Sequence, residues 1–240
     1  MNRILALSSR LALVALALLP AGCATLSAAV SGGGTVTNEQ IAERNKALDG
    51  AMASLAACGP KSQSTDVGLI AVSAGADGKV VVDAAQWMGS EESKACILAE
   101  AAKIQLPAWS GPTVSDVWAV GTQEHPAPPM VDKLPPSMQS RLQSLNAAAS
   151  DPETGPTVAC AQRNLSNDAY AVVSMRIFIF ADGKVVGATP WGIAGEGRDV
   201  GFLNCVRDFM VKDWKFDSFG KEGFTMTQVS LQRGIDTTNK

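Results

Sequence analysis

The chain is poor in the residue types on which catalysis, metal binding and nucleic-acid binding depend. It holds one histidine in 240 residues, and its charged fraction of 18% is below the usual quarter. The formal net charge is −3, without the clustered Lys and Arg of a nucleic-acid surface. No cysteine pair has Cys-x-x-Cys spacing, which argues against a zinc site or a thioredoxin-type motif. We therefore expect no nucleic-acid partner, no metal and no cofactor.

Candidate catalytic groups are equally scarce. The only histidine, His125, sits in a proline-rich stretch, which supplies neither a held imidazole nor an orienting partner. The spacing of Gly195, Gly197 and Gly201 departs from a dinucleotide-binding loop and lacks its parallel βαβ context. The clustered acids stand at predicted helix starts, where they suit the helix dipole: Glu91, Glu92, Glu196 and Asp199. We predict no catalytic residue; a cell-wall enzyme using two convergent carboxylates is the alternative.

The N-terminus has the pattern of an export signal. Arg3 and Arg10 precede an apolar run over 11–20 that is too short for a comfortable membrane span. Ala21 and Gly22 before Cys23 resemble a bacterial lipobox, which implies a signal peptide over 1–22 and lipidation of Cys23. The alternative is an ordinary secretory signal cut nearby. A multiply acylated Cys23 would anchor the protein firmly in a membrane.

The residue after Cys23 is Ala24 rather than Asp, which by resemblance to lipoprotein sorting favours the outer membrane. The predicted protein therefore faces the periplasm, with cell-surface exposure as an alternative. Residues 23–37 are small and polar and predict a flexible tether. Four cysteines then remain in an oxidising compartment, where an even number indicates disulfides with three possible pairings.

A repeated phrase defines the architecture. Asp-Gly-Lys-Val-Val begins at Asp77 and again at Asp182, each time between two β-rich runs, which is a hairpin signal. Around each turn the pattern reads helix, strand, strand, helix, strand. The predicted fold is α+β, in two tandem units that each have an antiparallel sheet. The first unit covers 38–122 and the second 137–234, joined by a proline-rich linker over 123–136 and followed by a tail over 235–240.

The repeat also selects a disulfide pairing. Each predicted unit has one cysteine before its hairpin and one in the helix after it. Matched positions favour pairing within each unit: Cys58 with Cys96, and Cys160 with Cys205.

These residues together resemble the AgmX/PglI C-terminal family, relatives of the TonB and TolA C-terminal domains. The first unit carries the resemblance on Cys58, Asp77-Gly78-Lys79-Val80, Cys96 and Leu106-Pro107. The second carries it on Cys160, Asp182-Gly183-Lys184-Val185, Cys205 and Trp214-Lys215-Phe216. The sequence departs from the family's Phe-Pro ending at Phe216-Asp217, and it has no TonB-type transmembrane anchor, which puts energy coupling to an inner-membrane motor in doubt.

The resemblance implies a small envelope domain that binds partners, for instance by lending a sheet edge to an extended segment. The candidate edges are the predicted strands 113–120 and 223–232. Tryptophans that end corresponding elements predict core packing, with ligand stacking as the alternative: Trp87, Trp191, Trp109 and Trp214. The expected function is a non-enzymatic adaptor of an envelope complex for transport or motility; the alternative is a purely structural lipoprotein. The sequence names neither the partner nor the oligomeric state.

Overall fold

The computed structural model describes residues 34–58, 68–120, 130–167 and 169–233. Several predictions concern residues outside these ranges: the signal peptide, Cys23, most of the tether, His125, the first half of the linker and the tail. The described residues all belong to one compact unit. We call residues 34–120 the first half and residues 130–233 the second half.

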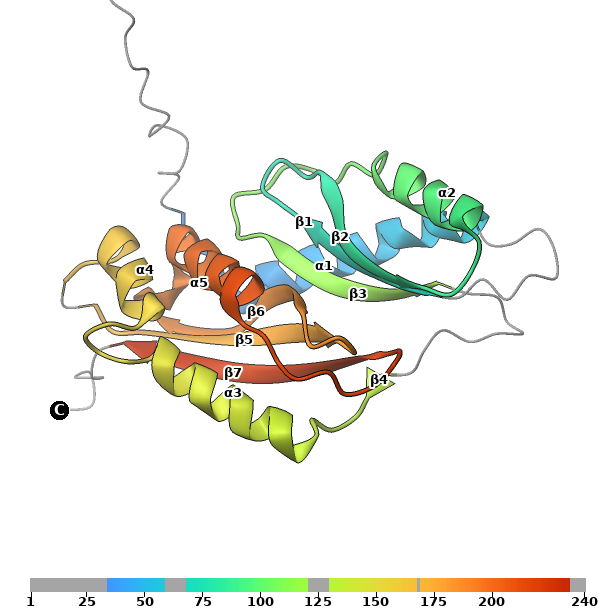
Figure 1. Cartoon of the computed structure of the whole chain (residues 1–240). Helices are drawn as coiled ribbons and strands as arrows, with labels where there is room; N and C mark the ends of the chain where they lie inside the picture. Colours follow the sequence, from blue (N-terminus) through green and yellow to red (C-terminus); the bar gives the residue numbers. More distant parts are fainter. Residues whose placement is uncertain (1–33, 59–67, 121–129, 168, 234–240) are drawn as a thin grey trace, which may run out of the picture. The chain divides into compact units, whose positions relative to one another are not determined.

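Helices and strands alternate in a similar order in the two halves (Figure 1). The first half contains α1 (Asn38–Met52), the 3₁₀ helix η1 (Ala53–Cys58), β1 (Gly68–Ala74), β2 (Val80–Trp87), α2 (Glu91–Ala101) and β3 (Val114–Val120). The second half contains β4 (Met130–Val131), α3 (Pro136–Ala149), α4 (Pro156–Asn164), β5 (Ala171–Phe180), β6 (Val185–Gly195), η2 (Glu196–Arg198), α5 (Val200–Asp213) and β7 (Phe224–Arg233).

Each half has its own sheet. The first sheet has the order β2-β1-β3, and both pairs are antiparallel. The second has the order β4-β7-β5-β6, in which β5 pairs antiparallel with β6 and β7, while β4 adds a short parallel pairing to β7. The fold is therefore α+β, as the sequence predicts. That the halves are two copies of one unit stays a prediction.

The two hairpin turns have the same construction. Gly78 and Gly183 adopt φ angles of 80° and 83°, which lie in the left-handed region that favours glycine. Before each glycine, the carboxylate of Asp77 or Asp182 accepts a hydrogen bond from the backbone N–H two residues on, at 3.1 and 3.0 Å. The shared Asp-Gly phrase thus fixes both the backbone turn and its side-chain support.

The same turns hold the chain that leaves the helix after each hairpin, α2 in the first half and α5 in the second. The carbonyl of Gly78 accepts from the N–H of Leu106 at 2.8 Å, and that of Gly183 accepts from Phe216 at 3.0 Å. Leu106 and Phe216 are both buried, so each turn closes over an apolar anchor. Leu106 and Phe216 therefore occupy equivalent places in the two halves, each bonded to the glycine of its own turn.

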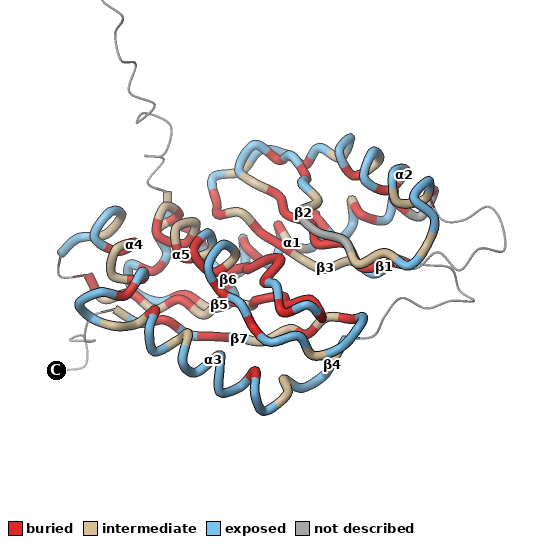
Figure 2. The backbone as a smooth tube through the Cα atoms, in the orientation of Figure 1, coloured by how far each residue is buried: buried red, intermediate tan, exposed pale blue. Residues whose placement is uncertain are grey.

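Each sheet places one face against helices of its own half. In β1, Ile70, Val72 and Ala74 belong to the main core, as do Leu48 and Met52 of α1. The start of α1 has a capping box, in which Thr37 and Gln40 exchange side-chain-to-backbone hydrogen bonds. Buried positions recur along one side of α1 while its other side is exposed, whereas every residue of β1 is buried (Figure 2).

The opposite faces of the two sheets meet each other. Leu69 and Ala71 of β1 form a second buried cluster with Phe178 and Phe180 of β5 and Val186 of β6. Successive side chains of β1 and β5 point to opposite faces of their sheets. One set therefore packs against the helices, and the other set forms the contact between the two halves. Among the described residues, no helix is long and apolar enough to cross a membrane.

Three local features differ from what the sequence suggests. Ser137 is a residue type that favours N-caps, yet helix α3 starts at Pro136, with Pro135 at the N-cap position and no side-chain cap. Cys160 lies within a helix that the sequence reading missed, α4. Part of the predicted linker forms strand β4, whose Met130 and Val131 pair with β7.

Candidate functional site: strand edges and a groove beside helix 1

Two disulfides fix helices next to each sheet. Cys58 at the end of η1 is bonded to Cys96 of α2, and Cys160 of α4 is bonded to Cys205 of α5. The Cα–Cα distances are 5.7 and 5.6 Å. This is the pairing that the repeat favours, and it is compatible with an extracytoplasmic location.

The edge of β3, one of the two predicted contact edges, has two of its outward N–H groups occupied by side chains. Ser115 N–H donates to Thr189 Oγ1 at 2.6 Å, and this hydroxyl in turn donates to the Ser115 carbonyl at 2.7 Å. Val117 N–H donates to the carboxylate of its neighbour Asp116 at 2.7 Å. Just before β3, Thr113 N–H donates to Asn204 Oδ1 of α5 at 2.9 Å. Residues of the second half thus cover much of this edge.

The other predicted edge, β7, is not the end of its sheet. Phe224 and Thr225 pair with β4, and the Thr225 hydroxyl donates to the Val131 carbonyl at 3.0 Å. Helix α3 packs beside β7 (Figure 1). Only the part of β7 from Met226 onward has no strand partner beyond β5 within the described residues.

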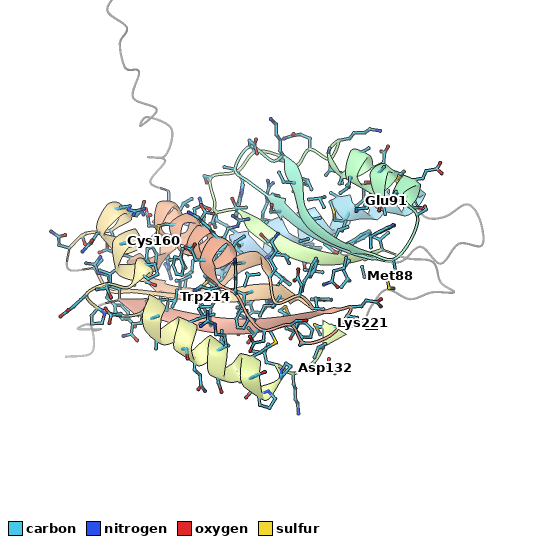
Figure 3. All side chains as sticks on the ribbon, in the orientation of Figure 1. Met88, Glu91, Asp132, Cys160, Trp214 and Lys221 are labelled. Carbon is cyan, nitrogen blue, oxygen red and sulfur yellow. A yellow bond between two sulfur atoms is a disulfide. The ribbon has the colours of Figure 1, made fainter. Side chains whose placement is uncertain are left out.

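Strand β2 is the edge that the sequence reading did not single out. Among the described strands it pairs with β1 alone, and it carries Val81, which is 52% exposed. Met88, which follows β2 and is labelled in Figure 3, is also an exposed large hydrophobic residue. The strand order that leaves β2 at the edge depends on tertiary pairing, so no local pattern in the sequence announces it.

The direction of the β2 amides follows from the pairing. Because Ser115 directs its N–H and C=O away from β1, Ser73 opposite it must direct its own toward β2. Ser73 pairs with Val81, so Val81 bonds to β1 and the next residue, Val82, turns its N–H outward. The same alternation applies to β7. Ala181 N–H donates to the Gly223 carbonyl, so Gly223 and every second residue after it bond to β5, and the backbone N–H of Gln228 points away from β5.

A groove runs between α1 and β6. An outer cavity of about 290 Å³ is lined by Asn38, Glu39 and Ile41 of α1 and by Pro190 and Trp191 of β6. An inner cavity of about 150 Å³ is lined by polar residues from three strands: Ser115, Asp116, Arg176 and Thr189. Ala42, Asn45 and Trp191 line both cavities, which makes the two cavities neighbours along one groove.

Trp191 is in this groove because of a β-bulge. The pairing of β5 with β6 passes from Ser174–Gly192 to Met175–Pro190, so Trp191 is an extra residue with no partner. A bulge re-aims a side chain, and bulges are frequent beside functional sites. The Trp191 side chain is 49% exposed, and the guanidinium carbon of Arg176 lies 3.5 Å from its ring centroid. This is a cation–π contact on a partly exposed indole.

The expectation of core packing holds for some tryptophans and not for others. Trp214 is buried in the core (Figure 3), whereas Trp87 and Trp109 are only partly buried. For Trp191 the expectation is wrong. Trp109 and Trp214 also do not occupy corresponding positions. Trp109 N–H donates to the carbonyl of Ala76, just before the first Asp-Gly turn, and Phe219 N–H donates to the carbonyl of Ala181, just before the second. Trp109 therefore corresponds to Phe219.

Burial controls the electrostatics of the inner cavity. Burial raises the pKa of the Asp116 carboxyl, and the hydrogen bond from Val117 N–H opposes this to a smaller extent. The nearby Asp49 carboxyl raises this pKa further, and Arg176 lowers it. Burial likewise lowers the pKa of the Arg176 guanidinium, which Asp116 partly offsets. The charges of Asp116 and Arg176 therefore sit in a partly desolvated place.

The remaining acids lie at helix starts, as the sequence predicts. Glu91 and Glu92 occupy the first turn of α2, Glu196 begins η2, and Asp199 caps α5 by accepting from Phe202 N–H at 2.7 Å. Gly197 lies so close to Val172 that a Cβ would sit 2.5 Å from its carbonyl oxygen, which gives it a packing role. No group of three or more potential metal-ligating side chains occurs within the described ranges.

Comparison with known proteins gives no match. No protein-family model, no curated protein and no solved structure matches this chain. The AgmX/PglI resemblance consequently rests on the quoted motifs alone and stays a prediction.

Proposed function

We propose that the chain is an exported, lipid-anchored envelope protein that acts as a non-enzymatic adaptor and captures a partner by strand addition at β2. The observation that carries the proposal is the contrast between the edges. The N–H groups of Thr113, Ser115 and Val117 along the β3 edge are occupied by Asn204, Thr189 and Asp116. Among the described strands, β2 pairs with β1 alone, and it displays an exposed valine.

An open edge can extend its sheet with a segment of another chain, which gains main-chain hydrogen bonds on one side. Alternate side chains of such a segment would lie beside Val81, which contributes apolar surface. The partner class is therefore an extended, partly apolar segment of an envelope protein. Transport or motility machinery, as the family resemblance implies, is the proposed setting.

Position-specific crosslinking tests the capture site. A photoreactive amino acid at Val81 should give recurrent crosslinks to one envelope protein in cells that make the chain. The matched control is Leu98, an exposed apolar residue on α2. Equal crosslinking from both positions, or crosslinks only between copies of the chain, would contradict the adaptor and favour a purely structural role.

Proline substitution provides the matched pair of variants. Val82→Pro removes an outward N–H from β2, and Gln228→Pro removes one from β7, so both changes leave the ladders to β1 and β5 intact. We expect only Val82→Pro to abolish capture while both variants unfold at similar urea concentrations. Loss of capture in both variants, or in neither, contradicts a specific β2 edge.

The proposed anchor has its own test. If Cys23 is acylated after cleavage, the N-terminal peptide of the purified protein begins at Cys23 and carries the mass of the attached lipid. Cys23→Ala should then release the protein from membranes. An unmodified N-terminus at a later residue would support the ordinary secretory signal and remove the membrane anchor from the proposal.

A further inference from the structure

The groove between α1 and β6 is lined by both aromatic and polar side chains, as ligand-binding sites are. Its outer cavity combines an exposed indole and Pro190 with amide and carboxylate side chains of Asn38 and Glu39. Together the two cavities, of about 290 and 150 Å³, reach the lower end of the range typical of small-molecule sites. This groove is independent of the β2 edge in the proposed function.

Three polar groups around the inner cavity lack hydrogen-bond partners within the described part of the chain. They are Ser115 Oγ, Asn45 Oδ1 and Arg176 Nε, and each belongs to a residue that lines this cavity. Ser115 is only 2% exposed, so its hydroxyl is both buried and unpartnered. Buried polar groups are normally paired, and each orphan costs free energy until a partner arrives.

These groups have complementary hydrogen-bonding roles. The Arg176 guanidinium can only donate, and the Ser115 hydroxyl can donate or accept. The Asn45 carboxamide offers both an oxygen acceptor and an N–H₂ donor. A ligand that fits must therefore present at least one acceptor and one donor within a small space. A secondary amide has this arrangement in its carbonyl oxygen and its N–H.

The outer cavity adds the indole of Trp191, one face of which carries the Arg176 guanidinium and the other of which is left for a ligand. The C–H-rich face of a pyranose ring packs well on an indole, while its hydroxyl groups bond to carboxamides and carboxylates at the ring edge. Trp191 supplies the indole, Asn38 and Glu39 supply the edge groups, and the bulge holds Trp191 at the surface. A peptide is a poorer fit, because an extended chain needs a continuous row of backbone partners along its length.

We propose that this groove binds an N-acetylhexosamine unit, with the pyranose ring on Trp191 and the acetamido group in the inner cavity near Ser115, Asn45 and Arg176. Binding is non-covalent and needs no cofactor. Acetylated amino sugars of this kind build bacterial cell-wall glycans, so such a site would let an envelope protein hold the wall while β2 holds a protein.

The test uses N,N′-diacetylchitobiose as the probe and the mature full-length chain as the protein. Binding is followed by calorimetry and by the shifts of tryptophan indole N–H signals. We expect saturable binding in which one indole signal moves. Cellobiose and fully deacetylated chitobiose, which lack the acetamido group, should bind at least about tenfold more weakly because the polar groups stay unpartnered.

Two variants separate a binding role from a structural one. Trp191→Ala removes an exposed ring and should weaken binding at least about tenfold, whereas Leu98→Ala, a matched exposed position on α2, should leave it unchanged. Ser115→Ala should weaken chitobiose binding without lowering the urea midpoint, because the lost hydroxyl has no partner to leave unpaired.

Several outcomes would overturn the inference. One is no binding of chitobiose; another is equal binding of cellobiose, which would remove the acetamido assignment. Binding that survives both Trp191→Ala and Ser115→Ala would place the sugar elsewhere. Displacement of chitobiose by a proline-rich peptide that binds more tightly would assign the groove to a peptide instead.

Discussion

Removal of either disulfide tests how the chain is stabilised. The bonds Cys58–Cys96 and Cys160–Cys205 close loops with sequence separations of 38 and 45 residues. In the chain-entropy model, loops of this size each restrict the unfolded state by about 4 kcal/mol at 25 °C. The two loop lengths differ by so little that the model separates the bonds by only roughly 0.2 kcal/mol.

The perturbation is the paired replacement of each bond by two alanines. Each paired variant should lose about 4 kcal/mol of unfolding free energy. With a urea m-value of roughly 2 kcal/mol/M, the unfolding midpoint should fall by about 2 M. Urea titrations followed by far-ultraviolet circular dichroism measure this shift, with the oxidised chain as the reference.

The two variants also act as controls for each other. Cys160 is almost fully buried and Cys205 partly so, while Cys58 is buried and Cys96 partly exposed, so the side chains lost are similar in both pairs. A loss below about 1 kcal/mol for either pair would refute the loop-constraint reasoning. It would mean that the reduced, unfolded chain already keeps the two helices together.

Three further changes test individual contacts. Gly183→Ala puts a side chain at φ 83°, 2.0 Å from the Phe216 carbonyl oxygen, and should cost at least about 1–2 kcal/mol in urea unfolding; a neutral result contradicts the turn geometry. Asp199→Ala removes the cap of α5 and should cost about 1 kcal/mol, measured in the same way. The pKa of Asp116 is raised in the folded state, so near this pKa the folded chain binds more protons than the unfolded chain. The contribution of Asp116 to the free energy of unfolding therefore falls as the pH rises from about 4 through that pKa. Asp116→Asn should therefore gain stability relative to the original chain between pH 4 and pH 7; a constant difference across this range would refute the burial effect.

The features that follow from local chemistry were predictable. Asp77-Gly78 and Asp182-Gly183 determine their turns through positive φ and a short side chain, both written in four consecutive residues. The disulfide pairing followed because the repeat placed the four cysteines at matched positions. The missed helix α4 also had a signal, since Gly155-Pro156 places proline at the first helical position.

The candidate groove was not predictable, because it depends on long-range pairing. Trp191 projects into it only because β6 carries an extra residue opposite β5, and the register between strands decides where that residue falls. Thr189 covers the edge of β3 across 74 positions of sequence. The sequence contains these residues, but the strand order that brings them together is a property of the folded sheets.

Residues 34–36, just before α1, are hydrogen-bonded to the segment at the start of α5. Val36 N–H donates to the Arg198 carbonyl at 3.2 Å, and Val200 N–H donates to the Gly34 carbonyl at 3.0 Å, so Thr35 bridges to Asp199. These contacts join the start of α1 to the start of α5. If the chain is exported N-terminus first, as proposed above, these contacts cannot form until most of its length has crossed the membrane. Closing contacts between residues so far apart in the sequence is entropically costly early in folding, so we expect the start of α1 to dock against the start of α5 late.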